Sequence, residues 1–160
     1  MKKSTKGFSL IELLIVVAII LIIAAIAIPN LLRSRIAANQ ASAVQSLRTV
    51  NTCEVSYATT YGTGFSATLA QLGPVATGAN ATAAAAGLID EVLATGLKSG
   101  YTLVYTPDPA PTNGVNNQYT ATNSPSSAQT GTNYYFTDQT MVIRVNNTAT
   151  ASASDSPIGN

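Results

Sequence analysis

The sequence predicts an α+β fold, in which a long N-terminal α-helix, membrane-spanning at first and amphipathic afterwards, packs against a small antiparallel β-sheet. Three observations predict it. Residues 13–28 read LLIVVAIILIIAAIAI, without a polar side chain. Residues 31–61 contain no glycine or proline and are rich in residues that favour helices. From Tyr101 onward, short runs of β-branched and aromatic residues alternate with turn residues, a pattern typical of strands.

The apolar run, extended back to Phe8, is long enough to span a bilayer, since a transmembrane helix needs about 20 predominantly apolar residues. It is preceded by three basic side chains, Lys2, Lys3 and Lys6. A basic flank marks the cytoplasmic side of a membrane, so we expect one pass with everything after Pro29 outside the cytoplasm. Without these lysines the chain keeps five basic and seven acidic side chains, which gives no electrostatic footprint for a nucleic acid.

The N-terminal segment departs from an ordinary secretory signal. Such a signal has about 7 to 15 apolar residues and is cleaved after them. Here the run is longer, and the candidate cleavage point, between Gly7 and Phe8, comes before it. Cleavage at this point keeps the membrane helix in the mature chain. The alternative is an uncleaved signal anchor, which leaves Glu12 unexplained.

Glu12 places a carboxylate inside the apolar stretch, where an ionised group costs about 2.5–3.5 kcal/mol. If the chain begins at Phe8, its α-amino group is largely protonated at neutral pH and lies four residues before Glu12, on the same helix face. In a lone subunit the two groups can pair internally or stay near the lipid headgroups. In an assembly, the amine of one copy can meet the carboxylate of the next. Such a buried pair fixes axial register more than it adds stability.

The stretch from Lys6 to Asn30 closely resembles the signature of type IV pilins and pseudopilins, with Gly7 before the cut, Phe8 after it and Glu12 four residues on. The resemblance implies that a prepilin peptidase cuts after Gly7 and methylates the amine of Phe8. It also implies that Glu12 pairs with the N-terminus of a neighbouring subunit. A proline inside a helix removes a hydrogen bond, so we expect a kink at Pro29, with a helix boundary at the membrane surface as the alternative.

The resemblance further implies a structural subunit of a type IV pilus, which polymerises with other copies of itself into a surface filament for adhesion or twitching motility. The expected partners are the prepilin peptidase, the assembly platform and ATPase, and an outer-membrane secretin. Before assembly the subunit would lie in the bacterial inner membrane. A minor pilin and a type II secretion pseudopilin are alternatives of the same fold. An alternative of another class is a membrane-anchored binding protein or enzyme that never polymerises.

Beyond Asn30 the helix is expected to continue with one buried face and to end near Tyr61, because glycines follow. The apolar residues of this face recur at helical spacing: Val44, Leu47, Val50, Tyr57 and Tyr61. Their partner should be a sheet. Cys53 lies near the same face and is interpreted as a small buried hydrophobe.

Short elements are predicted after the long helix. Helices are expected over residues 65–72, capped by Ser66, and over 88–94, with an exposed loop over 75–87 between them. Four antiparallel strands are predicted over residues 101–106, 118–122, 133–137 and 141–145, and a turn at 138–140 joins the last two into a hairpin.

The expected organisation has four regions. They are a leader peptide (1–7), a transmembrane and filament-core helix (8–29), its amphipathic continuation (30–61), and a globular head (62–160) that ends in a partly mobile tail from residue 146.

The residue types argue against catalysis. The chain has no histidine and no HExxH, GxSxG or Walker-type glycine loop, and its only cysteine, Cys53, has no imidazole to activate it. Asp90 and Glu91 are adjacent and would point in different directions on a helix, so a solvated face explains them better than a metal site. We therefore expect no enzyme, no cofactor and no metal.

The chain departs from two patterns of the family it resembles. Many pilins staple a C-terminal loop with a disulfide, which a single cysteine cannot form. Major pseudopilins usually carry an acidic, calcium-binding loop near the C-terminus, and no acidic cluster follows Asp108. The second departure favours a pilin over a pseudopilin.

Overall fold

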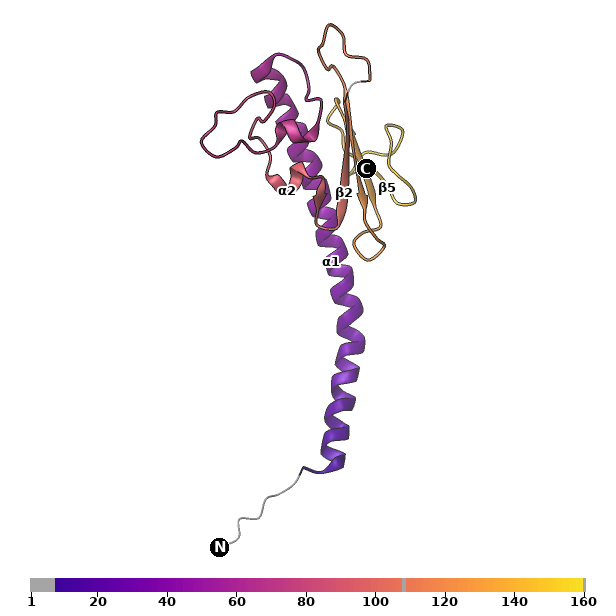
Figure 1. Ribbon diagram of the computed structural model, residues 1–160. Coiled ribbons are helices and arrows are strands. Elements are labelled where there is room, and N and C mark those ends of the chain that lie inside the picture. The colour runs from indigo at the N-terminus through magenta and orange to yellow at the C-terminus, as the bar shows by residue number, and fades with distance from the viewer. Residues whose placement is uncertain (1–7, 108, 160) are drawn as a thin grey trace. The chain divides into compact units, whose positions relative to one another are not determined.

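The computed structural model describes residues 8–107 and 109–159. The chain divides into two compact units, one up to Arg35 and one from Ile36. The helix α1, Leu10–Tyr61, contributes to both (Figure 1). In the second unit the C-terminal part of α1 packs against a five-stranded antiparallel sheet, which confirms the predicted α+β fold.

In the first unit α1 is apolar on every side. Its leucine, isoleucine and valine side chains between Leu10 and Leu32 are 41–79% exposed. A helix that is hydrophobic all round belongs inside a protein or a membrane, and α1 is long and apolar enough to cross a bilayer. The helix continues through Pro29, so the alternative of a helix boundary there is wrong, whereas the kink remains a prediction.

The strands of the second unit form one sheet in chain order. They are β1 Leu97–Lys98, β2 Tyr101–Pro107, β3 Tyr119–Pro125, β4 Tyr134–Asp138 and β5 Arg144–Asn146. Each strand pairs antiparallel with the next, so direct loops can join them without crossover connections. The first and last strands are therefore the two edges of the sheet.

The strand predictions need several corrections. The sequence does not predict β1, because a run of two residues is too short to show alternation. The strand predicted over 118–122 is β3, which starts one residue later and continues to Pro125. The strand predicted over 141–145 is β5, which starts at Arg144. Met141 has a left-handed backbone with φ 62°, which a strand cannot accommodate, so the predicted turn at 138–140 is also too short.

Both short helices are smaller than predicted. The first is the 3₁₀-helix η1, Leu69–Leu72, and its N-cap is Thr68, whereas the predicted cap, Ser66, is buried upstream of it. The second is α2, Glu91–Ala94, whose N-cap Asp90 accepts a hydrogen bond from a backbone N–H in the first turn. An acid that was expected only on a solvated face therefore begins a helix.

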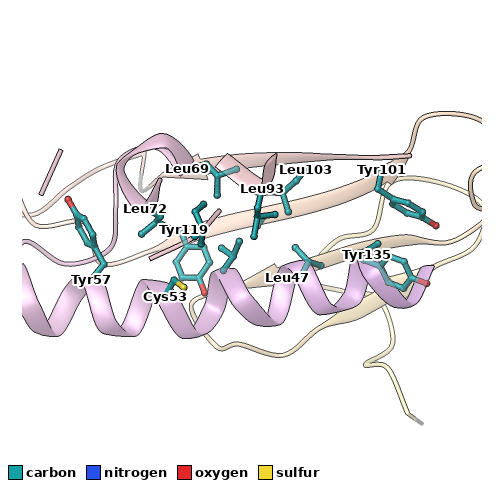
Figure 2. Packing of buried hydrophobic residues seen from close by; sticks show 14 of the residues in the cluster. Leu47, Cys53, Tyr57, Leu69, Leu72, Leu93, Tyr101, Leu103, Tyr119 and Tyr135 are labelled. Carbon is teal, nitrogen blue, oxygen red and sulfur yellow. The ribbon is translucent and has the colours of Figure 1, made fainter. Parts of the chain in front are cut away.

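The hydrophobic core lies between α1, the sheet and the segment that joins them. The predicted face of α1 is confirmed, since Leu47, Val50 and Tyr57 are buried and Val44 and Tyr61 are partly buried. Cys53 is also buried. The side chains that meet this face come from η1, α2, β2 and β3, and include Leu69, Leu72, Leu93, Leu103 and Tyr119 (Figure 2).

A carboxylate lies inside this core. Glu54 of α1 is fully buried, with 0% of its surface exposed. It accepts hydrogen bonds from the Ser66 backbone N–H at 2.8 Å and from the Ser66 hydroxyl at 2.6 Å. The Tyr105 hydroxyl donates to the Ser66 carbonyl at 2.8 Å. Through Ser66, the carboxylate connects α1 to the segment that follows it and to β2.

A second buried polar group of α1 holds the other half of the sheet. The Asn51 amide nitrogen donates to the Thr137 hydroxyl at 2.9 Å and to the Met141 carbonyl at 3.2 Å. The Asn51 carbonyl oxygen accepts from the Tyr119 hydroxyl at 2.9 Å. One side chain thus joins α1 to β3, to β4 and to the turn before β5. Buried polar groups with satisfied hydrogen bonds specify a unique packing arrangement.

The C-terminal tail adds backbone hydrogen bonds beyond β5. The Val145 N–H donates to the Ser156 carbonyl at 3.0 Å, and the Ile158 N–H donates to the Ile143 carbonyl at 2.9 Å. These bonds cover much of the open edge of β5, which would otherwise present unpaired backbone groups. The mobility expected for part of the tail remains a prediction.

Replacing Glu54 with alanine should lower the free energy of unfolding by about 1–3 kcal/mol, because the Ser66 N–H would be left buried without an acceptor and the Ser66 hydroxyl would keep only its longer contact with Tyr105. Chemical denaturation of the detergent-solubilised chain, followed by circular dichroism, measures the change. Thr52→Ala on the exposed side of the same helix is the control and should leave stability nearly unchanged. Equal stability of the two variants would contradict a structural role for the carboxylate.

Alkaline pH should unfold the head through its buried tyrosines. Burial, and secondly the neighbouring Tyr135, raise the pKa of Tyr101 from 10.0 to about 12. Burial and then Glu54 also raise the pKa of Tyr105 and of Tyr119. Because the unfolded chain releases these protons first, the stabilisation is complete below pH 10 and is lost as the pH rises through about 12.

The measurement for this prediction is tyrosinate absorbance and circular dichroism, recorded together across that range of pH. We expect ionisation of the buried tyrosines to coincide with loss of structure, and Tyr101→Phe to flatten the pH dependence. Ionisation of every tyrosine in a chain that remains folded would contradict this prediction.

Candidate functional site

Two of the residues singled out in the sequence, Phe8 and Glu12, lie at or just before the start of α1. Gly7 lies outside the described residues. Phe8 precedes the helix and is 79% exposed. Glu12 lies in the first turn of α1, and Pro29 lies inside the helix. The structure therefore brings Phe8 and Glu12 into one short stretch and leaves Pro29 several turns away.

The Glu12 carboxylate points back toward the beginning of the helix. Its oxygen accepts a hydrogen bond from the Ser9 backbone N–H at 3.0 Å. The Ser9 carbonyl accepts the first helical hydrogen bond, from Leu13 at 3.2 Å. A glutamate at the third helical position that returns to the N-cap N–H satisfies one of the free donors of the first turn, and its charge interacts favourably with the positive end of the helix dipole.

This geometry leaves Glu12 able to bind a cation. The Glu12 carboxylate accepts its hydrogen bond from Ser9, which directly follows Phe8 in the chain. A free amine at Phe8 would therefore lie close to the same carboxylate. A carboxylate has about four acceptor positions, and one bond to Ser9 leaves the others open. The arrangement can therefore pair with an amine of its own chain or of another chain.

An apolar groove runs along α1 from this carboxylate. The side chains that line it recur every three or four residues and are Leu10, Leu13, Leu14, Val17, Ala18 and Leu21. Rows of side chains at this spacing form the ridges and grooves through which helices pack on one another. The groove is thus a surface that a second apolar helix can fill.

Pro29 changes the backbone bonding of α1 further along. Because proline has no N–H, the carbonyl of Ala25 lacks its usual helical donor. One residue later, the Asn30 carbonyl accepts an additional hydrogen bond from the Ser34 hydroxyl at 3.1 Å. The helix is locally held by fewer backbone hydrogen bonds than its neighbouring turns.

The described part of the chain contains no group of three histidine, cysteine, aspartate or glutamate side chains that could hold a metal ion. The thiol of Cys53 donates to the Leu88 carbonyl at 3.2 Å. Burial, and secondly the Glu54 carboxylate, raise the pKa of this thiol above its ordinary value. A thiol with a raised pKa is a poor nucleophile at neutral pH, so Cys53 acts as a packing residue.

The sequence interpretation missed the buried acid of the head, Glu54. The available signal was its spacing, because Glu54 lies four residues after Val50 and three before Tyr57, in the middle of the buried face. An acid at such a position is exposed if the buried face of the helix is rotated away from it. Otherwise it is buried and needs hydrogen-bond donors beside it. The structure shows the second case, with Ser66 as the donor.

Comparison with known proteins matches the N-terminal part of the chain. A family model described as "Prokaryotic N-terminal methylation motif" matches residues 2–28. The "Type IV wide pilus major component PilA4" of Thermus thermophilus is 65% identical over 37 residues, which are 23% of this chain and 28% of that protein. The "Type IV major pilin protein PilA" of Myxococcus xanthus is 48% identical over 52 residues, 32% of this chain and 24% of that protein.

These alignments span about a quarter of the length of each relative. No solved structure matches the chain. The matched segment contains the apolar half of α1, and the helix then continues into a head in which it packs against an antiparallel sheet. With the methylation motif and the two pilin relatives, the N-terminal part of this chain is similar to that of type IV pilins, and the arrangement of helix and sheet accompanies this similarity.

Proposed function

We propose that this chain is a structural subunit of a type IV pilus, cleaved after Gly7 and polymerised through α1 into a surface filament. The observation that carries the proposal is a single carboxylate, Glu12, at the start of a helix half that is exposed and apolar on every side. A soluble monomer would expose this whole surface to water. Lipid and a bundle of identical helices are the two environments that remove it from water.

In the membrane stage, α1 spans the bilayer and Glu12 stays near the headgroups or pairs with the amine of Phe8. The cost of a buried, ionised carboxylate, about 2.5–3.5 kcal/mol, falls when a cation neutralises it. The bond from Ser9 to Glu12 supports this step, because it already directs the carboxylate toward the N-terminal end of the helix.

In the filament stage, the apolar groove beside Glu12 receives the helix of a neighbouring copy. Apolar contacts permit many axial positions of one helix along another, whereas a charge pair is satisfied at few of them. The amine of an incoming Phe8 against the Glu12 of its neighbour therefore selects the register. A buried pair of this kind contributes specificity more than net stability.

The partners of this process follow from the proposal. A prepilin peptidase would remove residues 1–7 and methylate Phe8. An assembly platform and ATPase would extract the subunit from the inner membrane, and a secretin would let the filament cross an outer membrane. The names of the two relatives describe major pilus subunits, which favours a major subunit here over a minor pilin or a secretion pseudopilin. Neither name describes an enzyme.

Adhesion and twitching motility are the activities we propose for the filament, since both need only a polymer of such subunits on the cell surface. The competing function is a membrane-anchored binding protein that never polymerises. Such a protein would need the apolar half of α1 for anchoring only, so it would not depend on a carboxylate within it.

Removing the charge of Glu12 should abolish assembly. Glu12→Gln keeps the size of the side chain but cannot neutralise an amine, and we expect no filaments in the fraction sheared from cells. The subunit should accumulate in the membrane at normal or higher levels, because the cost of inserting a charge is gone. Immunoblots of the sheared and membrane fractions measure both quantities. Filaments of wild-type abundance from Glu12→Gln cells would refute the assembly role.

Mass spectrometry of purified filaments tests the processing step. The intact mass should correspond to a chain that starts at Phe8 and carries one additional methyl group on its amine. Gly7→Val should retain residues 1–7, because a branched side chain replaces the small residue at the cut, and should give no filaments. A filament subunit that starts at Met1 would be incompatible with this proposal.

A further inference from the structure

Two apolar surfaces lie at opposite edges of the sheet. The first, called here the β1-edge patch, consists of Glu91, Val92 and Leu97. Val92 in α2 is 54% exposed and Leu97 in β1 is 59% exposed, and α2 contacts β1. Large apolar side chains this exposed, close together in the chain and beside an acid, form a candidate contact surface.

The second surface, called here the β5-edge groove, lies beyond the other edge of the sheet. It is a cavity between α1, the turn before β5 and the C-terminal tail. Its lining residues are Arg48, Met141, Val142, Ile143, Pro157 and Ile158. Met141 is 41% exposed and Ile158 is 39% exposed. The groove therefore combines apolar walls with one guanidinium.

One wall of the groove has an unusual backbone conformation. Met141 has φ 62°, a region that large side chains rarely occupy. The buried side-chain amide of Asn51 donates to the Met141 carbonyl at 3.2 Å. The Met141 N–H donates to the Asp138 carbonyl at 2.8 Å. The core thus fixes a backbone that presents a large apolar side chain to solvent. A conformation of this kind, held by its surroundings, is a pointer to function.

The charges of the two surfaces are opposite. Among residues 8–107 and 109–159, the one ion pair joins Lys98 to Asp90 at 3.0 Å. The guanidinium of Arg144 donates to a carbonyl of the tail at 2.8 Å. Arg48 and Glu91 are both exposed and form no ion pair within the described part of the chain. One surface therefore offers a cation and the other an anion.

We propose that the heads of neighbouring copies dock edge to edge, with the β1-edge patch of one copy in the β5-edge groove of the next. Glu91 then pairs with Arg48, and Val92 and Leu97 contact Met141 and Ile158. This inference rests on the proposed function, because it names a contact between heads within the filament.

The geometry of the sheet supports a second copy of this chain as the partner. Two different, complementary surfaces on one molecule give a heterologous contact, which repeats into a ring or a helical filament. The C-terminal tail already bonds to the outer edge of β5 through Val145 and Ile143. The contact is therefore made by side chains and does not extend one sheet into the next.

Charge reversal tests the proposed pairing. Arg48→Glu and Glu91→Arg each place like charges opposite one another and should reduce sheared filaments about tenfold relative to wild type. The double variant restores an opposite pair and should recover most of the yield. Val92→Lys should also reduce the yield, whereas Val104→Lys should not. Val104 is the matched control, because it is 54% exposed like Val92 but lies on the open face of the sheet.

Disulfide trapping tests the geometry of the contact. In a Cys53→Ala background, oxidised filaments of the double variant Arg48→Cys, Glu91→Cys should give a ladder of covalent oligomers. Each single variant should remain monomeric, because a heterologous contact never brings two identical positions together. Filaments that contain both cysteines and yield monomers only would overturn the docking proposal, as would wild-type yields from both single charge reversals.

The two proposals fail differently in these experiments. Should the docking proposal alone be wrong, wild type and all charge variants would form filaments equally well, while Glu12→Gln would still form none. If wild type itself forms no filaments, the proposed function is wrong. The docking proposal is then wrong as well, because it describes a contact within the filament.

Discussion

The apolar half of α1 cannot remain in water, and the rest of the structure follows from that constraint. Each of its leucine, isoleucine and valine side chains from Leu10 to Leu32 is at least 41% exposed, and surface of this kind is costly in water at roughly 25 cal/mol per Å². Lipid would remove the cost for a subunit held in a membrane, and other helices would remove it in the proposed filament. Since both environments are apolar, the hydrophobic effect alone distinguishes poorly between them. In the proposed filament, Glu12 supplies the distinction, because a carboxylate is matched by an amine and not by a lipid tail.

The second half of the same helix has a different structural role. It is the scaffold on which the head folds, and its buried face carries polar groups among the apolar ones. Glu54 fixes the segment after the helix, and Asn51 fixes β3, β4 and the turn at Met141. Apolar contacts alone would allow the sheet to slide along the helix. Directional hydrogen bonds from two positions on one face hold it in a single place.

Much of this organisation could be predicted from the sequence where the signal was local and periodic. The length of the apolar run predicted a helix long enough to cross a membrane, the spacing from Val44 to Tyr61 predicted its buried face, and the β-branched stretch after Tyr101 predicted the sheet. The family signature was readable because Glu12 is conspicuous inside an apolar segment. Its hydrogen bond to Ser9 follows from ordinary helix capping.

Other features could not be predicted because they depend on contacts between distant residues. The local sequence predicts Ser66 as a helix cap. In the structure, however, its N–H and hydroxyl both donate to the fully buried Glu54. The local sequence predicts Met141 as a strand residue. In the structure the Asn51 amide donates to the Met141 carbonyl and fixes a turn with a left-handed backbone at Met141. The strand β1 is two residues long and exists because β2 pairs with it. In each case tertiary contacts override local propensity.

The single cysteine has a broader consequence. With Cys53 buried and no second thiol in the chain, the head is held together only by packing and hydrogen bonds. Its fold is therefore independent of the oxidants and disulfide-exchange enzymes of the compartment where it forms. If the proposed filament forms, it can be dismantled and rebuilt from the same molecules, since no covalent bond between subunits has to be broken or remade in either direction.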